Sequence, residues 1–273
     1  MYDAMLLKRV LGTEIEFFEM LEMVQRGESH SKEDIQGVID HIFESWNVDG
    51  EPSKDVLLKG VSLYLSVKQK AIEEGYDAVS LIDVDGVKKL LEFPPAMVFM
   101  LLDEDPGVCT IPENDALGSV TQLITRYLTG QRSAYMEFYE FMEDRVLMGV
   151  PDFVPAEVVD GGIKTAAKAF GDFGAGLLNV STVKTGKVTL ARLTQRKDGY
   201  ALHAVTGEAV TPRSWAEEGW DDPAPQLPSL EIILDSPVEE FTQRVLSQHY
   251  IITYGDNLKL LSQFCRLAGI EMY

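Results

Sequence analysis

The chain has 273 residues, enough for two domains that each bury a hydrophobic core. Its 24 basic and 44 acidic side chains give a formal net charge of −20, which argues against binding to nucleic acids or anionic membrane surfaces, because those carry charge of the same sign. A hydrophobic content of 45% with 25% charged residues is that of a folded globular protein and not of a disordered chain.

The sequence shows no membrane-span or secretion pattern. No apolar run approaches the roughly 20 residues that a membrane span needs, and residues 1–12 carry charges of both signs in a helical pattern instead of a signal peptide. The two cysteines, Cys109 and Cys265, lie in apolar surroundings and are expected to be buried and reduced. We therefore expect a cytoplasmic protein.

The first half of the chain alternates predicted helices with predicted strands. Apolar residues at helical spacing mark the helices, bounded by caps such as Ser31 with Asp34 and by glycines such as Gly75. Helices are expected at residues 3–11, from Ser31 onward, and at 54–74, 96–102 and 115–128, and strands at 14–18, 78–82 and 108–111. This alternation is typical of a doubly wound parallel sheet. The chain begins in a helix without a preceding strand, which suits either a natural start or a truncated α/β unit.

The second half changes character after about residue 150. Period-two alternation and turn signals predict an antiparallel sheet or barrel, and helices follow near the C-terminus. The expected strands are residues 177–183, 187–193, 200–205 and 250–253, with turns at Thr185-Gly186 and Asp198-Gly199, a proline-rich connection at 220–228, and helices at 237–247 and 257–268. We therefore predict an α/β protein. An incomplete doubly wound, flavodoxin-like domain is expected at residues 1–129, and an antiparallel β-barrel-like domain with helices at residues 130–273.

A group of polar residues lies at the start of the helix predicted at residues 115–128. Glu113 directly follows a strand and precedes this helix, with Asn114 and Asp115 beside it. Ligands of open α/β sheets bind beyond the carboxyl ends of the strands, so this position suits a functional side chain. The same acids could instead cap the helix and complement its dipole, and the local sequence leaves both interpretations open.

Two further residues could meet this loop. Glu137 lies in an aromatic-rich segment where alternation would put Tyr135, Glu137 and Tyr139 on one face, so it is either a partly desolvated ligand or a solvated acid at a strand edge. His249 is either a ligand or a structural histidine, and His203 shares this ambiguity. Two carboxylates and one imidazole form a common divalent-metal site that leaves positions open for a substrate.

The glycine-rich segment at residues 170–176 matches neither a P-loop nor a dinucleotide-binding fingerprint. It could bring backbone close to a polyhydroxylated ligand, or it could be a simple connector.

Several motifs occur in an order that resembles the L-fucose isomerase/L-arabinose isomerase family. They are Pro112-Glu113-Asn114-Asp115-Ala116-Leu117, Leu128-Thr129-Gly130 followed by Glu137, Gly207-Glu208-Ala209, Gln248-His249-Tyr250 and Tyr254-Gly255-Asp256. The resemblance spans nearly the whole chain, which would correspond to the C-terminal two-thirds of the longer family members. It implies that Glu113, Glu137 and His249 bind a divalent metal, usually Mn²⁺. It also implies that Glu113 and Glu137 transfer protons and that Gln248 helps to hold the substrate.

The resemblance implies a metal-dependent aldose–ketose isomerase, a ketol isomerase that acts through an enediol(ate). The residue types suit this chemistry, because a metal stabilises charge on two neighbouring oxygens while carboxylates move the proton. The resemblance also implies a homo-oligomer, a hexamer in the family, with a small sugar as substrate. Glu137 stands where arabinose-type enzymes have Glu and fucose-type enzymes have Asp, so the sugar is left open.

Two alternatives to this enzyme are kept. One is a non-catalytic metal- or sugar-binding fragment or subunit that needs a separate N-terminal partner. The other is a metal hydrolase, which would cleave an ester or a phosphate substrate without forming a ketose.

Overall fold

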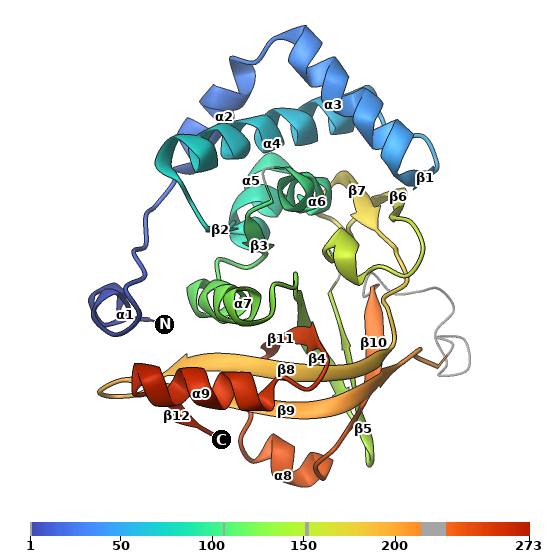
Figure 1. The fold of residues 1–273 in the computed structure, drawn as a ribbon. Helices are drawn as coiled ribbons and strands as arrows, with labels where there is room; N and C mark the ends of the chain where they lie inside the picture. Colours follow the sequence, from blue (N-terminus) through green and yellow to red (C-terminus); the bar gives the residue numbers. More distant parts are fainter. Residues whose placement is uncertain (1, 106, 151–152, 214–227) are drawn as a thin grey trace. The chain divides into compact units, whose positions relative to one another are not determined.

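The computed structural model describes residues 2–105, 107–150, 153–213 and 228–273. The chain folds into two units, each built from several stretches of the sequence (Figure 1). Unit 1 comprises Met1–Glu16, Ala116–Val150 and Val183–Tyr273, and unit 2 comprises Phe17–Asp115 and Pro151–Thr182. Each unit therefore contains residues from both sides of position 129.

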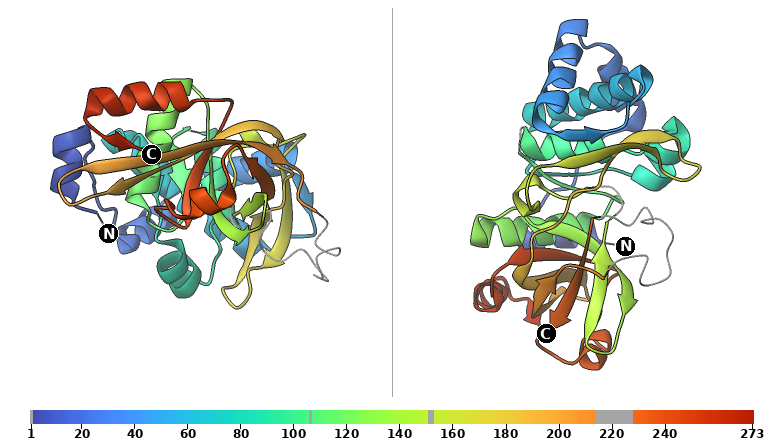
Figure 2. Two further views of the ribbon diagram at one scale, coloured as in Figure 1. Left: turned by 90° about the horizontal axis from the view of Figure 1, so that it is seen from below. Right: turned by 90° about the vertical axis from the view of Figure 1, so that its right-hand side faces the viewer.

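Unit 1 is built around a closed antiparallel barrel (Figures 1 and 2). Its strands in spatial order are β10 (Ser229–Leu234), β5 (Arg145–Gly149), β4 (Ala134–Phe141), β11 (His249–Tyr254), β8 (Gly186–Gln195) and β9 (Tyr200–Val210). Every neighbouring pair is antiparallel, and β10 also pairs with β9, which closes the ring. The short strand β12 (Glu271–Met272) adds parallel to β9. The chain is thus a mixed α/β protein, and the predicted barrel-like antiparallel fold is confirmed.

A glycine allows the closing strands to approach each other. Gly207 of β9 lies opposite Leu234 of β10, and a Cβ atom at Gly207 would lie 2.7 Å from the carbonyl oxygen of Ile233. A glycine inside a strand commonly marks such a close backbone approach. Gly207 therefore has a structural role in closing the barrel.

Helices α1 (Ala4–Leu11), α7 (Ala116–Thr129), α8 (Val238–Thr242) and α9 (Leu258–Ala268) complete unit 1. Apolar side chains of α1, α7 and α9 form one core with β8 and β9, which includes Leu7, Val120 and Leu261. Cys265 belongs to this core, and burial raises the pKa of its thiol to about 11. Cys109 is likewise buried, and both cysteines are free, as predicted.

One residue of α7 departs from its expected orientation. The apolar spacing in residues 115–128 predicts that Tyr127 faces inward, yet Tyr127 is 68% exposed. Ile124 is buried in the core, and Leu128, four residues later, packs against that core. Leu128 thus takes the inward position in the last turn of the helix, which leaves Tyr127 at the side.

Unit 2 contains helices packed around short sheets. The helices are α2 (Met20–Glu28), α3 (Lys32–Ser45), α4 (Lys54–Glu74), α5 (Lys89–Leu91) and α6 (Ala96–Glu104). Ser31 and Ser53 cap α3 and α4 by accepting the N–H groups of Asp34 at 3.0 Å and Val56 at 3.2 Å. These caps begin two of the predicted helices where the sequence indicated, because an N-cap side chain satisfies a free N–H group of the first turn. Helix α2 was not predicted.

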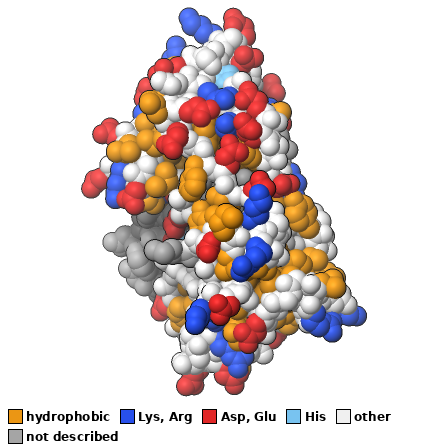
Figure 3. Space-filling model, turned by 90° about the vertical axis from the view of Figure 1, so that its left-hand side faces the viewer, with side chains coloured by type: hydrophobic (Ala, Val, Ile, Leu, Met, Phe, Trp, Pro, Cys, Tyr) orange, Lys and Arg blue, Asp and Glu red, His pale blue; other side chains and the backbone are white. Residues whose placement is uncertain are grey.

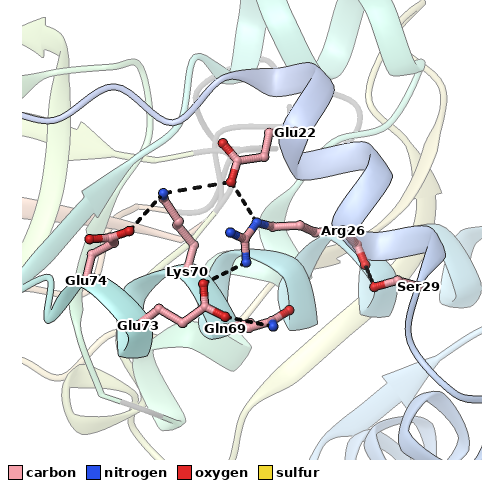
Figure 4. Close-up of polar contacts among 7 residues, drawn as sticks. All are labelled: Glu22, Arg26, Ser29, Gln69, Lys70, Glu73 and Glu74. Carbon is pink, nitrogen blue, oxygen red and sulfur yellow. Dashed lines mark hydrogen bonds and ion pairs between the residues drawn. The ribbon is translucent and has the colours of Figure 1, made fainter.

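Helices α2 and α4 lie side by side in Figure 1 and pack closely at Gly27, where a Cβ atom would lie 2.9 Å from the carbonyl oxygen of Ser62. Ion pairs join the same helices at the surface, where Arg26 contacts Glu22 at 2.7 Å and Glu73 at 2.8 Å (Figure 4). Acidic and basic side chains are interspersed over the molecular face in Figure 3 without forming a single patch. Exposed ion pairs contribute little to stability, whereas Met23 of α2 is buried in the same core as Val61 and Tyr64 of α4.

The sheets of unit 2 are small. Strands β2 (Ala78–Ser80) and β3 (Cys109–Ile111) form a parallel pair. Strand β1 (Asn47–Asp49) pairs parallel with β6 (Lys164–Ala169), which pairs antiparallel with β7 (Ala175–Asn179). A π-helical turn, η1 (Asp83–Lys88), follows β2, and a 3₁₀ turn, η2 (Ala156–Val158), precedes β6.

Two strand predictions were wrong in detail. Residues 14–18 form no strand, because the segment runs from unit 1 into unit 2 between Glu16 and Phe17. Ile15 nevertheless packs against the core of unit 1. Strand β7 pairs with β6 and not with β8, so no hairpin forms at Thr185-Gly186. The turn at Asp198-Gly199 does join β8 to β9, as predicted.

The helix expected at residues 237–247 is shorter in the structure, where α8 spans only Val238–Thr242. The proline-rich connection falls outside the described residues except for Pro228. None of the helices in the described part of the chain combines the length and apolar character that crossing a membrane requires.

The glycine-rich segment packs against its own unit. A Cβ atom at Gly174 would overlap the carbonyl oxygen of Glu92, and one at Gly176 would overlap the ring of Pro94. These two glycines therefore let the segment approach residues 92–94 closely.

Candidate functional site

Strand pairing in the barrel brings Glu137 and His249 together. Glu137 of β4 is the direct partner of His249 of β11, and side chains of directly opposed residues lie on the same face of a sheet. The Nε2 atom of His249 lies 3.8 Å from Oε2 of Glu137. The two side chains are only 8% and 18% exposed, respectively, so they are partly withdrawn from water yet remain accessible.

The neighbouring residues fix the orientation of this pair. The Tyr135 ring stacks on the His249 imidazole at a centroid distance of 4.6 Å and an angle of 6°. The side-chain amide of Gln248 donates a hydrogen bond to Oε2 of Glu137. On the other side of β4, Glu137 is paired with Gly149 of β5, which carries no side chain. A register shift follows between Phe138 and Glu140, and such bulges often redirect side chains next to functional sites.

The geometry of this pair suits two ligands of one cation. Metal–ligand bonds to imidazole nitrogen and carboxylate oxygen are about 2.1 Å long, so two ligand atoms of one ion lie at most about 4.2 Å apart. The separation of 3.8 Å falls inside this limit. Within either unit, the described residues contain no group of three or more His, Cys, Asp or Glu side chains arranged to hold a metal. Unit 1 thus brings together two of the three side chains that the resemblance names as ligands.

Glu113 belongs to unit 2, where it lies in the loop that follows β3. Its side chain is exposed, and its backbone adopts a φ of 68°, followed by 53° at Asn114. Its backbone N–H donates to Oδ1 of Asp83 at 2.6 Å. Because β2 and β3 are parallel and paired, the loop lies at their common carboxyl end, the position that the sequence indicated.

Sequence reasoning missed Asp83 and Lys88. The two form an ion pair at 2.9 Å, with side-chain exposures of 0% for Asp83 and 2% for Lys88. A signal was present, since Asp83 follows the apolar run that forms β2, as Glu113 follows β3. The π-helical turn that pairs these residues has no comparable sequence signature.

His203 has a structural role in the barrel of unit 1. The Tyr250 hydroxyl accepts a hydrogen bond from the N–H of Leu246 at 3.1 Å and is hydrogen-bonded to Nδ1 of His203 at 2.7 Å. Burial, with the positive charge of Arg244 as a smaller cause, lowers the pKa of His203 to about 4. His203 also lines a hollow of about 230 Å³ with Phe241 and Arg244. A neutral, hydrogen-bonded imidazole is the structural alternative that the sequence left open for this residue.

Comparison of the chain with models of known protein families gives no match, and comparison with curated proteins gives none either. The functional assignment therefore depends on the residues themselves.

Proposed function

We propose that this chain is a metal-dependent aldose–ketose isomerase of the L-fucose/L-arabinose isomerase type. The observation that carries the proposal is the pairing of Glu137 with His249 across β4 and β11, at a distance that one cation can bridge. These residues are far apart in the sequence, and the motif resemblance had already named both as ligands. Gln248, named as a substrate-binding residue, donates its amide hydrogen to Glu137 in the same place.

Each residue has a defined role in the proposed reaction. In the family that the motifs resemble, the residues at the positions of Glu113, Glu137 and His249 hold a divalent cation, usually Mn²⁺, which when bound stabilises negative charge on two neighbouring oxygens of the sugar. One carboxylate, Glu113 or Glu137, removes the proton from the carbon next to the carbonyl group and leaves an enediol(ate). Redelivery of this proton to the adjacent carbon, together with transfer of the hydroxyl proton to the former carbonyl oxygen, completes the exchange of aldose and ketose.

The low exposure of Glu137 supports its role as a base. Its carboxylate is mostly withdrawn from water yet still accessible, which suits a group that exchanges a proton with a bound sugar. The side-chain amide of Gln248 donates to Oε2 of Glu137, which helps to hold the carboxylate in place. The stacked ring of Tyr135 keeps the imidazole of His249 in one orientation.

The same resemblance extends the proposal to the fold and the assembly. The parallel pair β2–β3, connected through η1, α5 and α6, is a βαβ unit of the kind that builds a doubly wound, flavodoxin-like sheet. The proposal also includes a cytoplasmic homo-oligomer, a hexamer as in the family, with a small sugar as substrate.

Two measurements on the purified chain test the proposal. Calorimetric titration with Mn²⁺ reports metal affinity, and incubation with a panel of aldoses reports ketose formation. Glu113→Gln, Glu137→Gln and His249→Gln are each expected to abolish turnover and weaken Mn²⁺ binding. Glu140→Gln is the matched control, because Glu140 is an exposed acid on the same strand as Glu137, and it should leave both measurements unchanged.

Equal Mn²⁺ affinity in the wild-type chain and in Glu113→Gln would count decisively against the assignment. Isomerisation that requires an added N-terminal partner would favour the alternative of a metal- and sugar-binding subunit. Hydrolysis of an ester or phosphate without ketose formation would favour a metal hydrolase.

A further inference from the structure

The loop at residues 112–115, here called the Glu113 loop, is bound along its whole length by residues 80–83. The N–H of Glu113 donates to Oδ1 of Asp83 at 2.6 Å, and the N–H of Asn114 donates to the Leu81 carbonyl at 2.8 Å. The Ser80 hydroxyl accepts from the N–H of Asp115 at 3.0 Å and donates to the Pro112 carbonyl at 3.2 Å. The loop backbone is therefore held by the end of the neighbouring parallel strand.

The loop has an unfavourable backbone conformation. Glu113 and Asn114 are consecutive residues with φ of 68° and 53°, in the left-handed region that glycine adopts most easily. A loop that only connected a strand to a helix could place glycine at both positions without strain. The sequence instead keeps an exposed carboxylate and an amide there, and strained backbone of this kind clusters at functional sites.

The residue that holds Glu113 is itself fixed by a buried charge pair. Lys88 contacts Oδ2 of Asp83 at 2.9 Å, and its ammonium group lies 4.3 Å from the centre of the Phe170 ring. The two residues are five positions apart, and the π-helical turn that connects them has Val87 bonded to the Ile82 carbonyl at 3.0 Å. The i→i+5 hydrogen bonding of this turn places residues five apart on one side. One oxygen of Asp83 therefore binds Lys88 while the other binds the Glu113 backbone.

From this arrangement we infer that Asp83 is a positioning residue for Glu113. Its carboxylate, anchored by Lys88, fixes the strained backbone of the Glu113 loop so that the Glu113 side chain is presented in one direction. This role rests on the proposed function, in which Glu113 binds the metal and moves the proton. Partners one step removed from a metal typically change its affinity by about 10- to 100-fold.

The test compares two double variants that both remove the buried charges. Asp83→Asn/Lys88→Met keeps a side-chain acceptor for the Glu113 N–H, whereas Asp83→Leu/Lys88→Met removes it. Both avoid an isolated buried charge, which would destabilise the fold for an unrelated reason. Asp85→Asn is the matched control, because Asp85 lies in the same turn, is exposed and pairs with Lys89.

Two readouts separate positioning from general stability. Hydrogen exchange of peptides covering residues 112–117 reports whether the loop is held, and Mn²⁺ titration followed by electron paramagnetic resonance reports affinity. In Asp83→Leu/Lys88→Met, exchange should be faster and Mn²⁺ affinity lower by about 10- to 100-fold. In a Glu113→Gln background the same double variant should cause no further loss, because Asp83 acts through Glu113. Asp85→Asn should resemble the wild-type chain. Asp83→Asn/Lys88→Met keeps the acceptor but loses the Lys88 anchor, so its changes should be smaller than those of Asp83→Leu/Lys88→Met in both readouts.

Unchanged exchange in Asp83→Leu/Lys88→Met would overturn the inference, as would an equal loss of affinity in both backgrounds. If the wild-type chain itself binds no Mn²⁺ and forms no ketose, the proposed function fails instead. The exchange result then decides alone whether Asp83 holds the loop.

Discussion

The Glu137–His249 pair and the Glu113 loop are positioned in different ways. The first depends on the register of two barrel strands, and a shift of one residue would place the partners on opposite faces. The second depends on hydrogen bonds to residues 80–83 and on one buried ion pair. A strand register is shared by many backbone contacts, whereas the backbone N–H of Glu113 is held by one side-chain carboxylate. The loop should therefore be the more sensitive of the two to a single substitution.

The largest effect is expected when Lys88 is replaced alone. Lys88→Met leaves the carboxylate of Asp83 buried without its ion-pair partner, which should lower the free energy of unfolding by about 3–5 kcal/mol. Urea unfolding followed by circular dichroism measures this change. Lys89→Met, which removes an exposed partner of Asp85, should change stability by less than about 1 kcal/mol. Equal effects of the two substitutions would show that the buried pair does not support the loop.

The next effect concerns the glycine-rich segment that carries Phe170, the ring beneath Lys88. At Gly174, with φ of 94°, an alanine Cβ would overlap the carbonyl oxygen of Glu92, so Gly174→Ala should destabilise the chain by about 3 kcal/mol. Gly171 has a φ of 53° and open space around it, so Gly171→Ala should cost only about 1 kcal/mol. Thermal unfolding of both variants measures the difference. A smaller loss in Gly174→Ala than in Gly171→Ala would refute the close-packing explanation.

Acid should weaken the barrel through His203. Its pKa of about 4 in the folded chain lies below the ordinary value of 6.5, because burial disfavours the charged imidazole. Between pH 4 and 6.5 the unfolded chain binds a proton at His203 that the folded chain does not bind. The stability that the neutral imidazole contributes is therefore complete above about pH 6.5 and is lost as the pH falls toward 4. The loss is at most about 3 kcal/mol.

His203→Gln removes the titrating group while keeping a hydrogen-bonding partner for the hydroxyl of Tyr250. Urea unfolding at several pH values should show that the stability difference between wild type and variant changes only between about pH 6.5 and 4. A difference that stays constant over this window would exclude His203 as a source of acid sensitivity. Mn²⁺ affinity should be nearly unchanged, including in His203→Ala, because the imidazole is engaged with Tyr250 and not with the candidate ligands.

Local signals predicted much of the fold. The cap at Ser31 and the left-handed glycine at Gly75 bounded helices correctly, because each satisfies backbone groups at a helix end. Alternation identified the β7 segment as a strand but not its partner, so it was expected beside β8. At residues 14–18 the same pattern predicted a strand that does not form. Pairing depends on distant residues that a local pattern does not contain.

The candidate site shows the same limit. Motif resemblance named Glu137, Gln248 and His249, but the hydrogen bond that joins Gln248 to Glu137 connects residues 111 positions apart. Only the strand register brings them together. Asp83 was missed because its importance comes from the backbone N–H that it accepts and the lysine that it pairs with, and neither is visible in composition or periodicity.

The smallest effect tests the register-held pair through its aromatic neighbour. Tyr135 is 2% exposed and its ring stacks on His249, so Tyr135→Leu removes the stack and should lower stability by about 1 kcal/mol more than Tyr135→Phe, which keeps the ring. Urea unfolding of both variants gives the comparison. Because the strand register remains, Mn²⁺ binding should persist in both variants, in contrast to Asp83→Leu/Lys88→Met. Loss of binding in Tyr135→Leu alone would mean that the ring, and not the register of β4 and β11, positions the imidazole.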